Sequence, residues 1–361
     1  MNRVETCLAS LIRLYIKVPY KIIKSVKKYP RTLYLKEIAK AISDKEFDIL
    51  FRIRPKDGRE QKYLDYKGVL PKFAIVLQGP IRHEDSFTLN TVRYYHKMYS
   101  SAVVIVSTWN DEDLATVRKL ESAGASVILN EKPIYGGHRN INYQLVSSRA
   151  GIEAAYQMGL KYICKSRTDQ RLGKAHIFET LLNLINMFPS GDGQKQKQRI
   201  IALSMVYGNM FFPYLVSDFL YFGSADDIRK MFEVPLDQRE SFSMKKKATR
   251  RDYSEAVDPP EVYILQNYLR RIGVPCNCSI KDYWEALKKY LICIDRKMVD
   301  LIWPKYEGMY LEHEYFGDYF IDDFEDCLKT MNFDFTNWVN LYSGSLIYKP
   351  EYETMMDKVF R

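Results

Sequence analysis

The stretch Lys161-Tyr-Ile-Cys-Lys-Ser-Arg-Thr-Asp-Gln-Arg171 decides the fold. An apolar strand runs directly into a charged cluster, in which Lys165, Arg167, Asp169 and Arg171 fall within seven residues. In an open α/β sheet, ligands bind at the carboxyl ends of the strands, so charge at this position favours a binding site. A single carboxylate among fixed cations suits a diphosphate, with or without a divalent metal. The alternative is a solvated ion-pair network that merely ends the strand.

Apolar runs around this stretch predict a parallel sheet. We expect strands over 73–77, 102–108, 126–129 and 161–166, separated by helices over about 87–99, 112–123 and 143–158. Near-continuous apolar strands that alternate with helices are typical of βαβ units, whose strands are buried on both faces. The sequence therefore predicts an α/β fold with a Rossmann-type, mostly parallel sheet flanked by helices. This pattern by itself does not define a function.

The whole chain divides by composition into four segments. An apolar strand over 216–223 contains Asp218, and Pro259-Pro-Glu261 opens a helix that ends near Arg271, with proline at the position that helix geometry favours. The last hundred residues are tyrosine-rich and show no clear periodicity. We expect a tail over 1–31, a connector over 32–70, a catalytic core over 71–275 and a mixed acceptor or lid region over 276–361.

The net charge of +9 belongs mainly to the tail. Residues 1–31 carry eight basic side chains and one acidic one, which gives +7 and leaves +2 for the other 330 residues. Apolar residues recur on one helical face and basic residues on another, which predicts a cationic amphipathic helix on an anionic membrane surface. No run approaches the ~20 apolar residues that a membrane span needs. A helix packed on the protein's own core is the alternative, and nucleic acid is not an expected partner, because stacking aromatics do not alternate with these basic residues.

The cysteines and histidines show no pattern of a metal site. None of the six cysteines has metal-ligand spacing beyond a weak Cys276-Asn-Cys278, and no signal peptide is visible, which indicates reduced thiols in a cytoplasmic protein. The five histidines form no zinc pattern, and neither a serine nucleophile elbow nor a Walker loop is present.

Polar residues follow the other predicted strands and are expected to share one edge of the sheet with the charged cluster. Trp109 could wall a nucleobase or pack in the core, and the amides of residues 140, 142 and 144 could bind a ligand or cap a helix. These amides alternate with Ile141 and Tyr143, so we expect them to face one side. The candidate donor-binding residues outside the cluster are Gln78, Gly79, Pro80, Trp109, Asn140, Asn142, Gln144 and Arg149.

The motifs at these strand ends resemble those of a known family, the WavE group of lipopolysaccharide-synthesis proteins. The resemblance covers roughly residues 72–275 and implies a glycosyltransferase-like role in bacterial surface polysaccharide assembly, with the sugar left open. It rests on Ala74-Ile-Val-Leu-Gln-Gly-Pro80, Ile105-Val-Ser-Thr-Trp109, Asn140-Ile-Asn-Tyr-Gln144, Lys165-Ser-Arg-Thr-Asp169 and Ser217-Asp-Phe-Leu-Tyr-Phe-Gly223.

A broader resemblance is to GT-A glycosyltransferases. These enzymes place a small-residue helix, similar to Ser147-Ser-Arg-Ala-Gly151, before a strand that ends in Asp-X-Asp. Here Arg167 replaces the first Asp, so either Asp169 holds Mg²⁺ or Mn²⁺ together with substrate phosphates, or the cations alone neutralise the leaving diphosphate. Many GT-A enzymes also carry an acidic base at the start of a later helix that ends in Leu-X-X-X-Gly. Glu261, followed by Tyr268-Leu-Arg-Arg-Ile-Gly273, resembles that element.

These observations predict a nucleotide-sugar-dependent glycosyltransferase at the cytoplasmic face of the inner membrane, acting on a lipid-linked or lipopolysaccharide-type acceptor. Glu261 is the first candidate for the catalytic base and Asp218 the second, because an inverting transfer needs a carboxylate to take the acceptor proton. Helix-dipole complementation by Glu261 and a structural hydrogen bond of Asp218 are the alternatives. Two other functions stay open: a sugar-phosphate nucleotidyl- or phosphotransferase, and a non-catalytic scaffold of a polysaccharide assembly complex.

Overall fold

The computed structural model of the protein describes residues 14, 15, 17, 20, 30–42, 70–191, 195–204, 208–239, 242–306 and 331–360. The chain divides into two compact units, Met1–Arg59 and Glu60–Arg361. In the first unit, helix α2 covers Pro30–Ile42, and the four described residues before it are also helical. The remainder of the amphipathic helix expected over 1–31 lies outside the described residues. Among the described residues, no helix is long and apolar enough to cross a membrane.

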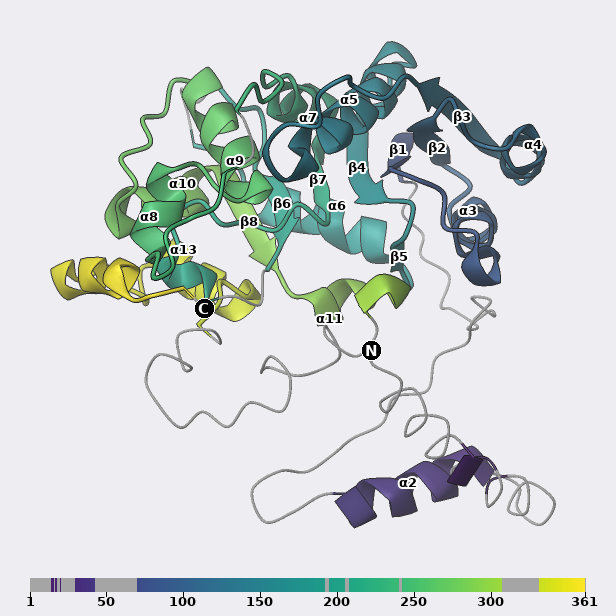
Figure 1. The fold of residues 1–361 in the computed structure, drawn as a ribbon, viewed down its shortest axis with the longest axis horizontal. Coiled ribbons are helices and arrows are strands. Elements are labelled where there is room, and N and C mark those ends of the chain that lie inside the picture. The colour runs from purple at the N-terminus through teal and green to yellow at the C-terminus, as the bar shows by residue number, and fades with distance from the viewer. Residues whose placement is uncertain are drawn as a thin grey trace. The chain divides into compact units, whose positions relative to one another are not determined.

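A seven-stranded sheet forms the centre of the second unit, in the order β3-β2-β1-β4-β7-β6-β8 (Figure 1). The first four strands in this order are parallel, whereas β7 runs antiparallel to both of its neighbours. The predicted α/β fold, with a mostly parallel sheet flanked by helices, is thereby confirmed. The strands are β1 (Phe73–Gln78), β2 (Ala102–Trp109), β3 (Ala125–Asn130), β4 (Tyr162–Arg167), β6 (Ile200–Leu203), β7 (Tyr221–Ser224) and β8 (Leu291–Ile294).

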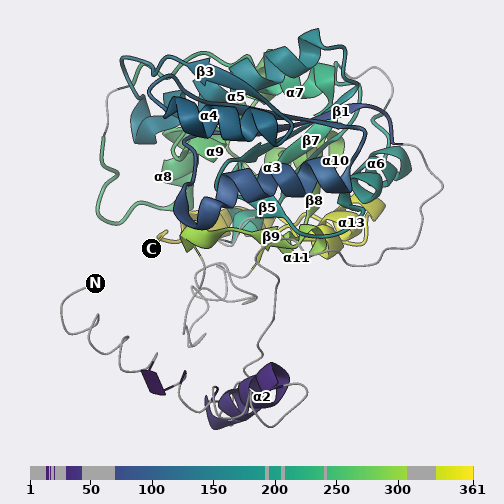
Figure 2. The ribbon, with the colours of Figure 1, turned by 90° about the vertical axis from the view of Figure 1, so that its right-hand side faces the viewer.

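Helices cover both faces of the sheet. Figure 2 shows α5 (Ile141–Gln157) and α7 (Ala225–Phe232) on one side, and α3 (Phe87–Met98) and α6 (Ile177–Met187) on the other. Aromatic rings join the second pair of helices to the sheet, since the Phe178 ring of α6 lies 4.7 Å from that of Phe73 in β1. The further helices are α4 (Leu114–Ser122), α8 (Arg250–Glu255), α9 (Pro260–Arg271), α10 (Ile280–Tyr290), α11 (Arg296–Val299) and α13 (Phe335–Ser343).

The small residues expected before β4 let helix α5 approach the sheet closely. A Cβ atom at Gly151 would lie 2.5 Å from Val76 Cγ1 and 3.1 Å from the Ser107 Cβ. Both distances are shorter than ordinary contacts, so only glycine fits at this crossing.

Strand β8 lies beyond residue 275, where the sequence indicated the end of the core. It pairs in parallel with β6, from Ile200–Leu291 to Leu203–Ile294. All four residues of β8 are buried. The sheet therefore continues into the last segment of the chain.

The strand expected over 216–223 is shorter than predicted, because regular pairing begins only at Tyr221. The residues before it are buried in irregular backbone, and Asp218 lies in a bend rather than inside a strand. Their apolar composition predicted their burial correctly. It could not predict whether they pair with a neighbouring strand, which decides where a strand begins. Because β7 runs antiparallel to β4, the residues that precede β7 lie at the edge where β4 ends.

A second, two-stranded sheet completes this edge. Strand β5 (Arg171–Leu172) pairs antiparallel with β9 (Leu301–Ile302). This pairing brings Trp303, which follows β9, next to the residues between β4 and β5.

Candidate functional site

The ends of three parallel strands form one row at the carboxyl edge of the sheet. Gln78 of β1 is in register with Ser107 of β2 and with Arg167 of β4. In the next pair of strands, Trp109 is in register with Asn130. The polar residues that follow these strands therefore start from neighbouring points, as the sequence indicated.

Thr168 fastens the turn after β4 to the turn after β1. Its backbone N–H donates to the Gln78 carbonyl at 3.1 Å, and its Oγ1 donates to the Pro80 carbonyl at 2.5 Å. The Thr168 carbonyl accepts a hydrogen bond from Thr88 Oγ1 of α3 at 2.9 Å. Between them, Gly79 has φ +109°, a conformation that strongly favours glycine. The segment that carries Arg167 and Asp169 is therefore cross-linked on two sides.

Arg167, Asp169 and Trp303 form a compact group, which we call the clamp. Arg167 donates from Nε to Asp169 Oδ1 at 2.9 Å and from Nη2 to Oδ2 at 3.2 Å. The Trp303 indole Nε1 donates to Asp169 Oδ2 at 3.0 Å, and its ring lies 5.4 Å from the Arg167 guanidinium. Although burial acts to raise the pKa of Asp169, the hydrogen bonds and charge of Arg167 and the Trp303 donor hold it below its ordinary value.

The other two cations of the cluster lie elsewhere. Lys165 is fully buried, and its Nζ donates to the Asp218 backbone carbonyl at 2.6 Å. Burial lowers the pKa of the Lys165 ammonium to about 8. Arg171 is also buried and contacts α3, where Nε donates to Thr91 Oγ1 at 3.0 Å and the guanidinium lies 4.9 Å from the Phe87 ring. The structure thus separates the predicted cluster into one partly exposed and two buried cations.

Two carboxyls, those of Asp218 and Glu261, lie close enough for the charge of Asp218 to act on Glu261. Asp218 precedes β7, and Glu261 occupies the first turn of α9, as predicted. Burial and the nearby Asp218 carboxylate raise the pKa of the half-buried Glu261 to about 8. Burial, followed by the charges of Asp218 and Glu261, also raises the pKa of the buried Tyr221 well above its ordinary value. Glu261 is therefore able to exchange a proton near neutral pH.

Arg139, in the loop between β3 and α5, lies near Glu261 and is paired with a third carboxylate, Asp258. Its Nε lies 2.6 Å from Oδ1 of the fully buried Asp258, and Nη2 donates to Oδ2 at 3.0 Å. Asp258 also contacts His138 Nε2 at 2.9 Å. The Arg139 side chain remains half-exposed, and its charge acts on the Glu261 carboxyl. Arg139 is thus a cation at the edge of the site that the sequence analysis missed.

The three amides expected to face one side do not do so. They lie around the start of α5. In a helix, positions two apart point in different directions, so the alternation of polar and apolar residues did not place these amides on one face. Asn140 is exposed, whereas Gln144 is half-buried. Asn142 is buried, donates to the carbonyls of Tyr135 and Asp237, and accepts from the Asp237 N–H. These bonds give Asn142 a structural role, and a donor contact through it stays an untested prediction.

Gln78, Trp109 and Arg149 also have partners within the protein. The Gln78 Oε1 accepts from Ser147 Oγ at 2.9 Å. Trp109 is buried, with its ring edge-on to that of Tyr143 at 5.6 Å. Arg149 donates to the carbonyls of Phe232 and Val234 at the end of α7. These contacts give each of the three residues a structural role. Whether the three residues also contact the donor stays a prediction.

Asp169 is the predicted metal ligand, but its surroundings do not fit that role. Both carboxylate oxygens accept hydrogen bonds from Arg167, and one also accepts from Trp303. A divalent ion at these oxygens would lie against a guanidinium of the same sign of charge. Across the described ranges, no group of three His, Cys, Asp or Glu side chains is placed to hold a metal ion.

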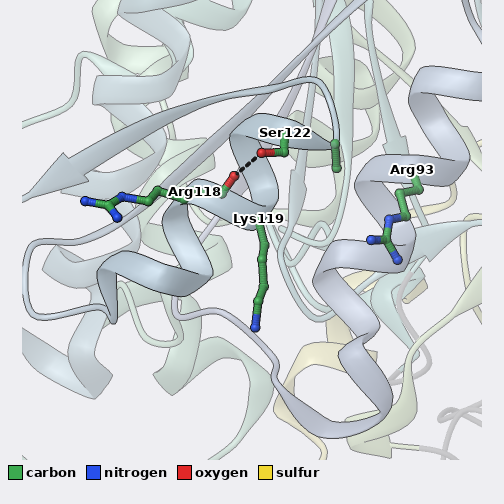
Figure 3. Close-up of a pocket in the computed structure, with 5 residues that line it drawn as sticks. Arg93, Arg118, Lys119 and Ser122 are labelled. Carbon is green, nitrogen blue, oxygen red and sulfur yellow. Dashed lines mark hydrogen bonds between the residues drawn. The ribbon is translucent and has the colours of Figure 1, made fainter.

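A pocket of about 230 Å³ lies on the surface between α3 and α4 (Figure 3). It is lined by Arg93, Arg118, Lys119, Ser122 and Ala123. None of these residues belongs to the carboxyl edge of the sheet, so we do not assign the transfer site to this pocket.

Other residues of the site were missed for different reasons. Trp303 lies more than 130 residues from its partner Asp169, and no local pattern marks it. Gln170 lies inside the quoted stretch, is fully buried, and neither its Oε1 nor its Nε2 has a hydrogen-bond partner among the described residues. Gln170 directly follows Asp169 at the end of a predicted strand, and this position in the sequence could have marked it as a candidate site residue.

Comparison with known proteins gives one match over most of the chain. Residues 73–356 match the model of a family described as WavE lipopolysaccharide synthesis, which confirms the resemblance seen in the sequence. The comparison with curated proteins gives no match.

Three solved structures share parts of the fold at low similarity. HddC from Yersinia pseudotuberculosis is 9% identical, with 48% of this chain and 84% of that chain covered and a TM-score of 0.28. Mannose-1-phosphate geranyltransferase from Thermus thermophilus is 9% identical, with 45% and 63% covered and a TM-score of 0.27. Mouse xyloside xylosyltransferase 1 in its apo form is 11% identical, with 63% and 86% covered and a TM-score of 0.31. Similarities this low carry no argument about function.

Proposed function

Because the chain belongs to the WavE lipopolysaccharide synthesis family, we propose that it is a glycosyltransferase. It moves a sugar from a nucleotide-sugar donor to a lipid-linked or lipopolysaccharide-type acceptor. The donor base, the sugar and the acceptor hydroxyl are not specified by this proposal.

One observation carries the proposal: a fixed cation and a proton-accepting carboxyl share the carboxyl edge of the sheet. Lys165 donates to the Asp218 carbonyl, and the charges of Asp218, Arg167 and Asp169 all act on it, which supports a common location for these groups. Such an arrangement offers one group to a departing diphosphate and another to an attacking hydroxyl. Glycosyl transfer from a nucleotide sugar needs both.

The chemistry follows directly for a transfer with inversion. The acceptor oxygen forms a bond to the anomeric carbon while the bond from that carbon to the diphosphate oxygen breaks. The bonding electrons leave with the diphosphate, whose added charge Arg167 stabilises. The proton of the acceptor hydroxyl passes to the Glu261 carboxylate, and Asp218 raises the proton affinity of that carboxylate by its own charge.

The proposal is tested by ligand binding followed by product analysis. Thermal unfolding is measured with UDP-, GDP-, CMP- and dTDP-sugars, since a ligand at a hundred times its dissociation constant stabilises a protein by about 2.7 kcal/mol. Transfer to a lipid-linked acceptor is then followed with the stabilising donor, for wild type and Glu261→Gln. Glu255→Gln, at an exposed position in α8, is the matched control. Binding without turnover would favour a scaffold. Release of pyrophosphate when a nucleoside triphosphate and a sugar 1-phosphate replace the donor and acceptor would favour a nucleotidyltransferase.

We also propose that residues 1–31 hold the enzyme at the inner face of the inner membrane. Their charge of +7 supports this, because each basic residue near an anionic surface contributes about 1 kcal/mol. Deletion of residues 1–31 is expected to abolish co-sedimentation with vesicles containing about 30% anionic lipid, a composition chosen to give a negatively charged surface. Transfer to a soluble acceptor should be unaffected. Unchanged co-sedimentation of the shortened protein would refute the anchoring role.

A further inference from the structure

The clamp has the features of an anion-binding group. Arg167 is anchored through two hydrogen bonds to one carboxylate, yet 24% of its side chain is exposed, compared with 14% for Asp169. Lys305, which is exposed, contributes a second positive charge close to Asp169. Among the described residues, the charges of two cations therefore act on one carboxylate.

The clamp is also rigid before any ligand arrives. Trp303 is fixed by the pairing of β9 with β5 and by an edge-on contact with Phe219, 4.5 Å between ring centroids. On the other side, Thr168 is bonded to the turn after β1. A guanidinium held in place loses less entropy on binding phosphate than a mobile one, and its planar donors match phosphate oxygens.

We propose that Arg167, held by Asp169 and Trp303, binds the diphosphate of the donor in the place that a divalent metal would take. Asp169 is then a positioning residue for Arg167 and not a metal ligand. The inference rests on the proposed function, since it concerns the donor of that reaction. It follows from the hydrogen bonds that occupy Asp169 and from the positive charge that Arg167 places beside it.

The contrast with the neighbouring cations supports the assignment to Arg167. Lys165 is enclosed by the Tyr221 and Phe232 rings, at 5.9 and 5.5 Å, and bonds to a backbone carbonyl. Arg171 is enclosed by side chains of α3. Of these three charged residues, Arg167 alone combines an anchored guanidinium with an exposed surface.

The test is calorimetric titration of the full chain with UDP, GDP, CMP and dTDP, in EDTA and again in Mn²⁺. Binding of CMP alone would overturn the inference, because CMP carries no diphosphate. We expect the nucleotide that binds to do so with the same affinity in both buffers. Binding that EDTA abolishes and Mn²⁺ restores would overturn the inference while leaving the proposed function intact. Failure of every nucleotide to bind in either buffer would instead refute the proposed function and the inference with it.

Variants separate the positioning role of Asp169 from a metal-ligand role. Arg167→Met should weaken binding by about 10- to 100-fold, the range for a lost hydrogen bond to a charged group. Asp169→Asn should weaken it by the same factor in EDTA and in Mn²⁺, because the loss is one of orientation. Trp303→Phe keeps a ring under the guanidinium and should lose about 2- to 10-fold. Arg118→Met, at an exposed arginine on α4, is the control. An Asp169→Asn loss that appears only with Mn²⁺ would contradict the positioning role.

Discussion

Replacement of Glu261 by glutamine should make the protein more stable at alkaline pH. In the folded protein, burial and the Asp218 carboxylate raise the pKa of Glu261 to about 8, from an ordinary value of 4.5. Between these two pH values the unfolded chain has released the proton and the folded chain still holds it. The stability that this carboxyl contributes is therefore complete below about pH 4.5 and is lost as the pH rises to about 8.

The size of the effect follows from the same pKa difference. At 1.36 kcal/mol per pKa unit, the step from 4.5 to about 8 corresponds to an upper bound of about 5 kcal/mol. Glu261 is half-buried, so solvent screening reduces the expected loss to about 2 kcal/mol. Glutamine does not ionise and escapes this loss. For the unit Glu60–Arg361, with an unfolding entropy of about 2.1 cal/mol/K per residue, the Glu261→Gln variant should gain about 3 °C in melting temperature at pH 9.

The assay is thermal unfolding from pH 4 to pH 9 for wild type, Glu261→Gln and the exposed control Glu255→Gln. The melting temperatures of wild type and Glu261→Gln should converge at the acid end and separate steadily as the pH rises. A difference that stays constant over this range would refute the reasoning, because it would mean that Glu261 ionises equally in both states. The raised pKa of Glu261 also predicts the pH dependence of sugar transfer. The kcat/KM of wild type should increase with pH towards about 8, because the ionised form of Glu261 is the base.

Three further substitutions test the structural roles described above. Gly151→Ala places a Cβ 2.5 Å from Val76 Cγ1 and should cost about 1–3 kcal/mol by overpacking, measured by urea unfolding. Asn142→Ala removes three hydrogen bonds to the loops around Tyr135 and Asp237, two of them buried, and a loss of about 2–4 kcal/mol is expected in the same measurement. Arg149→Met should lower the melting temperature by removing two bonds at the end of α7 but leave nucleotide affinity unchanged; a change in affinity would return Arg149 to the donor site.

Local patterns were sufficient for the elements of the parallel half of the sheet. Strands β1, β2 and β4 are within one or two residues of the expected ranges, because continuous apolar runs between helices have few other stable arrangements. The helix that begins at Pro260 was also predicted, since proline at its start and Glu261 in its first turn are local features.

Patterns that depend on distant partners were misread or missed. The buried segment before Tyr221 looked like a strand, yet it lacks a ladder, because a strand needs a partner in register as well as apolar residues. Strand β8 has only four residues, too few for a periodicity to be recognised. The alternation from Asn140 to Gln144 was taken for a single face, although a helix places these residues in different directions.

The sequence by itself determined that an α/β sheet ends in charge, with a carboxyl at the start of a later helix. It could not determine which charges are enclosed by the fold, because Lys165, Arg167 and Arg171 have similar local surroundings along the chain. The tertiary structure decided this through contacts from remote segments: α7 and the loop before β7 enclose Lys165, α3 encloses Arg171, and Trp303 anchors Asp169 beside Arg167. Burial in a low-dielectric interior, set by those remote contacts, separates the enclosed cations from one that stays partly exposed.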